Sequence, residues 1–226
     1  WETFNVFEPS ITWDNVEKAS NSIEQKLQEL ANGITKDYGV KVTPVVNTGN
    51  PTNEIVRFAK EINADLIVMG THGYSAWEDL TIGSNTLKVI TKCPCPVLTM
   101  SQFVETLGYH KIVMALDMSE HSRHKVPATI DLAKQFSAQI YVIGVLTSDE
   151  ESKKPSMEVM LKQVEQAAAK AGLICKSELK TNVKNRAVET VNYCKAVEGD
   201  LITIMTDQDA ELSGFFIGNY ALQVIH

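Results

Sequence analysis

Residues 64–70 read Ala-Asp-Leu-Ile-Val-Met-Gly, and residues 199–205 read Gly-Asp-Leu-Ile-Thr-Ile-Met. Residue 64 aligns with residue 199, and the same offset of 135 residues matches further segments without a gap. The other matched pairs are Ile82-Gly83 with Ile217-Gly218, Leu87 with Leu222, Asn50 with Asn185, and Glu54 with Glu189. Because one register aligns several separate segments, the sequence indicates an internal duplication.

The duplication predicts two tandem domains joined by a short linker. We place the first repeat at residues 1–101, the linker at 102–109 and the second repeat at 110–226. The second repeat opens with a strand, a helix and a second strand whose equivalents would lie mostly before residue 1. The first repeat continues into a last strand that the second repeat does not reach. We therefore expect truncation at both ends, the first repeat lacking its first strand, its first helix and most of its second strand, and the second repeat lacking its last strand.

Strands and helices alternate along both repeats, which predicts an α/β fold. Short apolar runs such as 65–69 are typical of buried parallel strands, while longer segments show apolar residues at helical spacing. We expect two tandem, doubly wound open parallel sheets, each flanked by helices on both faces. The expected helices are 13–36, 51–62, 83–91, 119–136, 155–171 and 185–197, and the expected strands are 40–46, 65–69, 96–100, 111–116 and 140–146.

The composition disfavours several classes of function. The 226 residues carry a formal net charge of -7, and neither repeat is basic, so a nucleic-acid-binding surface is not expected. An acidic chain is equally unsuited to an anionic membrane surface. No apolar run has the length of a membrane-spanning helix. We predict no nucleic-acid partner and no membrane association.

The four cysteines indicate whether the protein belongs in a reducing or an oxidising compartment. Cys93 and Cys95 are separated by a single proline, a spacing too tight for an ordinary structural disulfide and unlike the paired CxxC spacing of zinc sites. We interpret these two, together with Cys175 and Cys194, as reduced and mostly buried thiols. Reduced thiols suit a reducing compartment, so the predicted location is the cytoplasm.

The stretch that bears chemistry is Gly70-Thr71-His72-Gly73, followed after nine residues by Gly83-Ser84. The first two glycines follow a predicted buried strand, and Gly83-Ser84 opens a predicted helix. In open parallel sheets, ligands bind at the carboxyl ends of strands. Glycines there let backbone N–H groups approach an anion, and a helix N-terminus adds donors. Spacing alone leaves a second reading open, in which the glycines turn the chain and Ser84 caps the helix.

This pattern, preceded by a strand ending in Val-Met and followed by Cys-Pro-Val-Leu at 95–98, resembles the nucleotide loop of the universal stress protein family. The resemblance covers nearly the whole chain as two repeats. It implies Rossmann-like sheets, a pseudo-dimer within the chain or a homodimer, and cytoplasmic stress adaptation. ATP-binding members of the family place the phosphates on this loop. The residues thereby implied to bind ATP are Met69, Gly70, His72, Gly73, Gly83, Ser84 and Asn85.

The loop of the second repeat departs from the family pattern. Met205 and Gln208 stand where Gly70 and Gly73 stand in the first repeat. A methionine side chain at the first glycine position would crowd a phosphate. Two further loop residues, Asp207 and Asp209, add negative charge where the anion should lie, which is unfavourable.

Remnants of a second site remain in the second repeat. ATP-binding members of the family use an acidic residue at the end of the first strand, a position held here by Asp117. Gly218 survives from the loop pattern, and Asn219 replaces the serine. We therefore predict nucleotide binding in the first repeat alone.

We predict a regulatory, non-catalytic role, with ATP or a related adenine nucleotide as the ligand. No nucleophile–base pair, paired carboxylates or P-loop lysine accompanies the loop. Slow ATP hydrolysis stays open as one alternative, and an interaction module that binds protein partners and no nucleotide is another. His121 and His124 lie three residues apart with no third ligand and are interpreted as a solvated helix face. No metal is therefore expected beyond the magnesium that accompanies a nucleotide.

Overall fold

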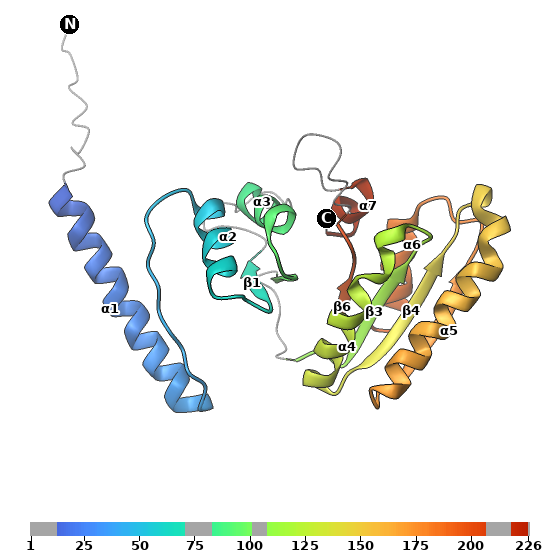
Figure 1. The fold of residues 1–226 in the computed structure, drawn as a ribbon, viewed down its shortest axis with the longest axis horizontal. Helices are drawn as coiled ribbons and strands as arrows, with labels where there is room; N and C mark the ends of the chain where they lie inside the picture. Colours follow the sequence, from blue (N-terminus) through green and yellow to red (C-terminus); the bar gives the residue numbers. More distant parts are fainter. Residues whose placement is uncertain (1–12, 71–82, 101–107, 207–217, 226) are drawn as a thin grey trace, which may run out of the picture. The chain divides into compact units, whose positions relative to one another are not determined.

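The computed structural model describes four stretches of the chain, residues 13–70, 83–100, 108–206 and 218–225. They divide into two compact units, Trp1–Glu54 and Ile55–His226. Both units contain helices, and the β-strands described all lie in the second unit (Figure 1). These strands form separate parallel sheets, one in each repeat of the sequence.

The amino-terminal helix α1 spans Trp13–Tyr38, close to the predicted 13–36. The helix stops before Gly39, whose φ of 69° lies in the left-handed region that glycine adopts without strain. This backbone conformation cannot continue the helix. The Gly39 N–H still donates to the carbonyl oxygen of Thr35 at 2.9 Å. One of the last carbonyl groups of the helix is therefore satisfied.

The strand predicted at 40–46 is wrong, because residues 39–48 have no regular secondary structure. Their side chains still alternate in exposure, as the exposed Lys41 and half-buried Val42 illustrate. Alternation alone does not make a strand, since a strand also needs backbone hydrogen bonds from a neighbour. Among the described residues, no strand pairs with this segment.

Helix α2 spans Pro51–Glu61 and begins where the sequence predicts. The side-chain oxygen of Asn50 accepts the N–H of Asn53 at 3.2 Å, so Asn50 caps the helix. Pro51 occupies the first helical position, where no intrahelical partner exists for the N–H that proline lacks. The beginning of this helix is therefore encoded locally.

The first repeat contains two parallel strands, β1 (Ile67–Gly70) and β2 (Val97–Met100), connected through helix α3 (Ser84–Lys92). The sequence predicts a buried β1, but Val68 is 57% exposed. Exposure alternates along β1, so one of its faces is covered and the other is not. The prediction of a fully buried strand is therefore wrong for the face that carries Val68.

In the second repeat, the described strands form a parallel sheet in the order β5-β4-β3-β6. Their bounds are β3 (Lys111–Leu116), β4 (Gln139–Val145), β5 (Cys175–Lys180) and β6 (Leu201–Thr203). The predicted 111–116 and 140–146 match β3 and β4 to within one residue, whereas β5 was not predicted. Strand β3 is central, because it is hydrogen-bonded to β4 on one edge and to β6 on the other.

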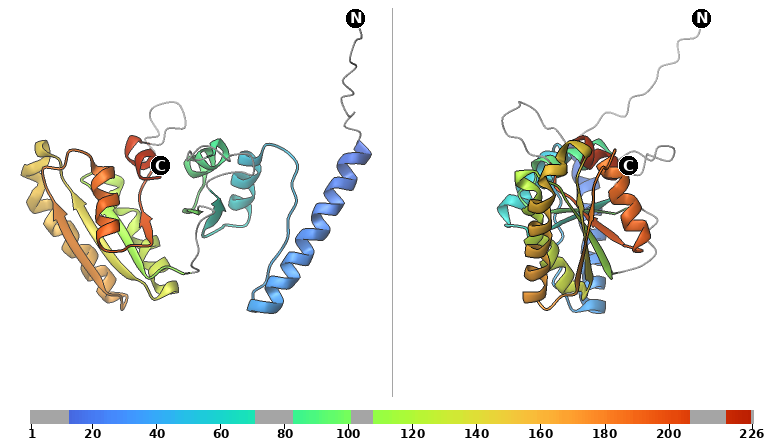
Figure 2. Two further views of the ribbon diagram at one scale, coloured as in Figure 1. Left: turned by 180° about the vertical axis from the view of Figure 1, so that it is seen from behind. Right: turned by 90° about the vertical axis from the view of Figure 1, so that its right-hand side faces the viewer.

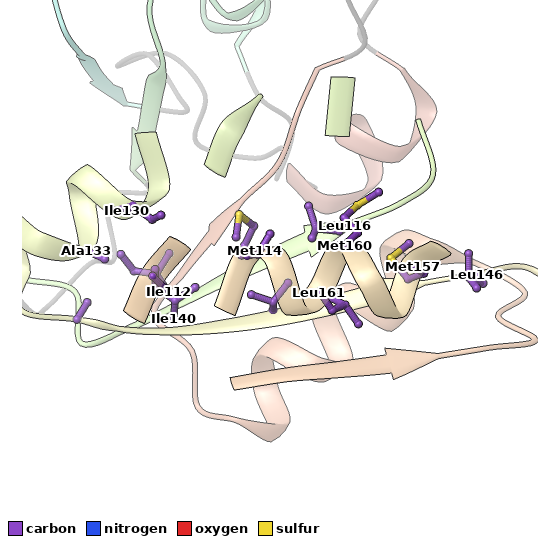
Figure 3. Close-up of a cluster of buried hydrophobic side chains, with 14 residues drawn as sticks. Ile112, Met114, Leu116, Ile130, Ala133, Ile140, Leu146, Met157, Met160 and Leu161 are labelled. Atoms are coloured by element: carbon purple, nitrogen blue, oxygen red, sulfur yellow. The ribbon is translucent and has the colours of Figure 1, made fainter. Parts of the chain in front are cut away.

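Helices cover both faces of this second sheet, which confirms the doubly wound α/β fold. Successive side chains of a strand point to opposite faces. Ile112, Met114 and Leu116 therefore join one core with helices α4 (Lys125–Phe136) and α5 (Lys154–Lys170), shown in Figure 3. Val113 and Ala115 join a second core with α6 (Arg186–Ala196). Figure 2 shows α5 and α6 on opposite sides of the strands.

The continuous helix predicted at 119–136 is wrong. A 3-10 helix, η1, covers Glu120–Arg123, and α4 begins after it at Lys125. Pro127 explains the break, because it has no N–H to donate to the carbonyl oxygen of Arg123 and is favoured in a first helical turn. The remaining elements are η2 (Ser148–Lys153) before α5, and α7 (Asn219–Ile225) near the carboxyl end.

The duplication is visible in the backbone hydrogen bonds of the two repeats. Two bonds in the first repeat illustrate this, because each has a counterpart in the second at the same offset. The N–H to carbonyl pairs are Leu87 to Gly83 at 3.1 Å with Leu222 to Gly218 at 3.2 Å, and Ala64 to Ala59 at 2.9 Å with Gly199 to Cys194 at 2.8 Å. Asn185 also caps α6 as Asn50 caps α2. The tandem repeat is therefore one of structure as well as of sequence.

All four cysteines are free thiols, but the expectation that most are buried is wrong. Cys194 is buried, while Cys93, Cys95 and Cys175 are half-buried. Desolvation raises the pKa of each thiol, and it raises the pKa of Cys175 to about 11. Because the thiolate is the nucleophile, these cysteines are poorly reactive.

Gly199→Ala should destabilise the second repeat. A methyl group at Gly199 would lie 2.7 Å from Cγ2 of Val113 and 2.8 Å from Sγ of Cys194, and both of these side chains are buried. Overpacking of this kind costs about 1–3 kcal/mol, so the urea midpoint should fall. In the matched control Gly33→Ala, the methyl group meets nothing within 4 Å, and the midpoint should hold or rise. An unchanged midpoint for Gly199→Ala would contradict the packing described.

Candidate functional site

The first region of interest lies where β1 ends and α3 begins. Met69 and Gly70 close β1, while His72 and Gly73 fall within 71–82, outside the described residues. The hydroxyl of Thr86, in the first turn of α3, donates to the carbonyl oxygen of Gly70 at 3.1 Å. This hydrogen bond holds the end of β1 beside the start of α3.

The start of α3 has no side-chain cap among the described residues. Gly83 is the N-cap residue, and its carbonyl oxygen accepts the N–H of Leu87 at 3.1 Å. The alternative in which Ser84 caps the helix is wrong, because Ser84 is the first helical residue and is exposed, as is Asn85. Such a helix start offers backbone donors and a partial positive charge, which suits an anion.

The second repeat contains a cavity of about 80 Å³ at the carboxyl ends of β3 and β4. Its lining combines apolar, hydroxyl-bearing and charged side chains. The lining residues are Ala115, Leu116, Val145 and Met205; Ser119, Ser122 and Tyr220; and Asp117, Lys125 and Arg186. Of the three residues predicted as remnants of a second site, Asp117 lines this cavity and Gly218 and Asn219 do not.

Asp117 follows β3 and is held by its neighbours. Its Oδ1 atom accepts the N–H of Ser119 at 3.0 Å and the hydroxyl of Ser119 at 2.6 Å. The Asp117 N–H in turn donates to Oγ of Ser122 at 3.0 Å. Desolvation acts to raise the pKa of Asp117, but the Ser119 hydrogen bonds and the charge of Lys125 lower it below its ordinary value. Asp117 is therefore a carboxylate, and an acceptor, at neutral pH.

Lys125 places a positive charge in the wall of the cavity. The residue is only 8% exposed, and its Nζ atom donates to the carbonyl oxygen of Ser122 at 2.7 Å. A buried ammonium group is costly unless hydrogen bonds and a nearby negative charge compensate it. Ser122 and Asp117 supply that compensation, which ties η1 to the end of β3.

A second cation, Arg186, reaches the cavity from the first turn of α6. Its Nη2 atom forms an ion pair with the carboxylate of Glu150. Glu150 also accepts the N–H of Thr147 and Nζ of Lys153, each at 3.2 Å. Burial acts to raise the pKa of Glu150, but the Arg186, Thr147 and Lys153 bonds lower it to about 2. The Nε atom of Arg186 is buried and has no hydrogen-bond partner within the described part of the chain.

Two large side chains occupy positions where the first repeat has smaller residues. Met205 aligns with Gly70, and Tyr220 aligns with Asn85. The ring of Tyr220 packs against the core shared with α6, and its hydroxyl lies 3.1 Å from the hydroxyl of Thr190. Pockets for drug-sized ligands have volumes of about 300–1,000 Å³. The second-repeat cavity, at about 80 Å³, is too small for an adenosine group.

Sequence reasoning identified Asp117 but missed Lys125, Arg186 and Tyr220. No local motif joins these residues, because they come from α4, α6 and α7 and converge only through the order of the strands. A signal was available for Tyr220, which the duplication aligns with Asn85. Arg186 could have been noted as the residue that follows the capping Asn185.

Other candidate features form no further site. The rings of His121 and His124 contact each other edge to face, with centroids 5.2 Å apart. In the stretches that the structure describes, no group of three or more His, Cys, Asp or Glu side chains could hold a metal ion. None of the described helices combines the length and the apolar character needed to traverse a bilayer.

Comparison with known proteins identifies a family. The sequence profile of the universal stress protein family matches residues 7–100 and 108–226. Universal stress protein MJ0531 of Methanocaldococcus jannaschii is 34% identical over 91 residues, which cover 40% of this chain and 54% of the relative. Universal stress protein YxiE of Bacillus subtilis is 31% identical over 93 residues, covering 41% and 63%. The chain thus spans about half to two thirds of the length of these relatives.

A solved structure has the same fold over nearly the whole chain. The crystal structure of a universal stress protein from Archaeoglobus fulgidus aligns with a TM-score of 0.75, covering 98% of this chain and 80% of that one. The two sequences are 19% identical, so the likeness shows the fold alone. The paired matches of the family profile agree with the internal duplication.

Glu150→Gln should lower the stability of the second repeat at neutral pH by about 1–2 kcal/mol, since it removes charged hydrogen bonds to Arg186 and Lys153. Because the pKa of folded Glu150 is lowered from 4.5 to about 2, its contribution is full above pH 4.5 and is lost as the pH falls toward 2. In thermal melts across this range, the difference in melting temperature between Glu150→Gln and the wild type should shrink as the pH falls. Glu158→Gln, exposed on α5, is the control. A difference in melting temperature that stays constant with pH would contradict the stabilising role given to the Glu150 carboxylate.

Proposed function

The chain belongs to the universal stress protein family, and from this premise we propose that its first repeat binds ATP or a related adenine nucleotide as a regulatory ligand. One observation carries the proposal. Thr86 bonds the end of β1 to the first turn of α3, and the helix starts at Gly83-Ser84 without a side-chain cap in the described residues. The phosphates of a nucleotide are the chemistry that such a helix start favours.

The proposed contacts follow from what each residue can offer. Gly70 and Gly83 have no side chain to keep a phosphate from the backbone. Ser84 and Asn85 are exposed at the start of α3 and carry polar side chains that can donate. Met69, His72 and Gly73 belong to the same proposed site. Any magnesium ion would arrive with the nucleotide phosphates.

We assign no nucleotide to the second repeat. Its cavity of about 80 Å³ supports this assignment, because Met205 and Tyr220 line it in place of two smaller residues of the first repeat. The second repeat would then serve as a structural or partner-binding half. The role proposed for the whole chain is cytoplasmic stress adaptation, with slow ATP hydrolysis as the limit of its catalysis.

A second candidate function is protein binding through the first repeat without a nucleotide. Three large apolar side chains in and before β1 are exposed: Ile62 by 55%, Leu66 by 38% and Val68 by 57%. Exposed apolar side chains mark interaction sites where they gather into one patch. Such binding is compatible with a nucleotide sensor, and it becomes the leading function if ATP does not bind.

Titration calorimetry of the whole chain with ATP should show saturable binding near one site per chain. Gly83→Val should weaken ATP binding at least about tenfold, because the branched side chain blocks backbone approach at the helix start. Gly218→Val makes the same change at the equivalent position of the second repeat and should leave ATP binding unchanged. Ser84→Ala should weaken binding by a smaller factor.

The outcomes separate the two candidates. If Gly83→Val and Gly218→Val weaken ATP binding equally, the result would contradict a site confined to the first repeat. No heat at millimolar ATP with the folded wild-type chain would overturn the nucleotide proposal and leave the protein-binding function.

A further inference from the structure

The segment between α3 and β2 carries two cysteines and is anchored at both ends. Cys93 is the C-cap residue of α3, and its N–H donates to the carbonyl oxygen of Val89 at 2.9 Å. Beyond Cys95, the carbonyl oxygen of Pro96 accepts the N–H of Ile67 at 3.0 Å, at the start of β1. The two cysteines are therefore held between a helix end and a strand.

Prolines restrict the backbone that separates the two thiols. Pro94 and Pro96 each have φ fixed at about -65°. A residue before proline is held in an extended conformation, and Cys93 has a φ of -71° and a ψ of 145°. Two residues of chain span at most about 7.2 Å, so the thiols of Cys93 and Cys95 lie within reach of one bound ion.

The thiols also act on each other electrostatically. Burial raises the pKa of Cys93, the charge of Cys95 raises it further, and the nearby Lys60 opposes both. Burial and then the charge of Asp65 raise the pKa of Cys95. Both groups are therefore thiols at neutral pH, and a metal ion that binds them must displace their protons.

Two thiols without a third ligand restrict the kind of metal. Zinc takes four protein ligands in structural sites and three in catalytic sites. Within the stretches that the structure describes, no group of three or more His, Cys, Asp or Glu side chains could hold a metal ion. Thiolates select soft ions such as Cu(I), which is satisfied by two sulfur ligands in a line. The pair thus suits Cu(I) and not Zn(II).

The surroundings suit the charges of such a complex. The ion would lie at the carboxyl end of α3, where the helix dipole favours a cation. Two thiolates and one Cu(I) together carry a single negative charge. Lys60, whose positive charge acts on Cys93, offsets that charge. Both sulfur-bearing residues are half-buried and Pro94 between them is exposed, so an ion can reach the pair from solvent.

We propose that Cys93 and Cys95 bind one Cu(I) ion per chain as a two-coordinate thiolate complex. Each thiol gives its proton to solvent and forms a sulfur–copper bond, and no oxidation state changes. Weak nucleophilicity does not prevent this exchange, because the metal itself displaces the protons. The pair lies at the carboxyl end of α3, whereas the proposed nucleotide site lies at its amino end. Neither proposal depends on the other.

The test titrates Cu(I) into the whole chain, under a reductant and without oxygen, in competition with the Cu(I) chelator bicinchoninate. The wild type should take up one Cu(I) per chain and develop an ultraviolet thiolate-to-copper absorption band. Cys93→Ser and Cys95→Ser keep the size of the side chain and remove a soft ligand, so each should weaken binding at least about tenfold. Cys175→Ser, the matched change at a half-buried cysteine outside the pair, should leave binding unchanged.

X-ray absorption spectroscopy of the copper-loaded wild type examines the site without any variant. It should show two sulfur neighbours around copper and no nitrogen. This measurement decides the question even if a serine variant fails to fold, which circular dichroism would reveal. Three or more ligands would overturn the proposal, as would Cu(I) binding that is unchanged in Cys93→Ser or Cys95→Ser, or that Cys175→Ser weakens as much. Zn(II) bound by the wild type as tightly as Cu(I) would also overturn it.

Discussion

The second repeat depends on the position of β3, which is hydrogen-bonded on both edges and packed on both faces. The carboxylate of Asp200 fixes where β3 enters the sheet, because it accepts the N–H groups of His110 and Lys111 at 2.6 Å and 3.1 Å. From there β3 pairs in parallel with β4 and β6, so the carboxyl ends of these strands meet at one edge. The cavity lined by Asp117 and Val145 lies at that edge.

The same strand explains why the repeats differ at matched positions. Residue 64 is alanine in the first repeat, and its counterpart in the second is Gly199. A Cβ atom at Gly199 would lie 2.7 Å from Val113 of β3, so the central strand requires glycine there. In the described part of the first repeat no strand pairs with the equivalent edge of β1, and alanine is accommodated. The same aligned position is therefore packed differently in the two repeats, and it requires glycine in the second alone.

Local signals predicted much of the fold. The helices predicted at 13–36 and 51–62 match α1 and α2 to within two residues, and short apolar runs placed β3 and β4 to within one residue. The errors have physical causes. Segment 40–46 has a strand-like pattern but no partner to supply hydrogen bonds. The helix at 119–136 breaks because Pro127 lacks an N–H, a signal that was present in the sequence.

By itself, the sequence determined the duplication and the order and type of most elements, because these depend on residues close in the chain or on matching of one segment to another. Only the tertiary structure decided that Lys125, Arg186 and Tyr220 line one cavity with Asp117, and that this cavity measures about 80 Å³. It also decided that Val68 is exposed. Convergence of distant side chains and burial of a strand face depend on which elements pack together in space, and periodicity within a segment does not encode that choice.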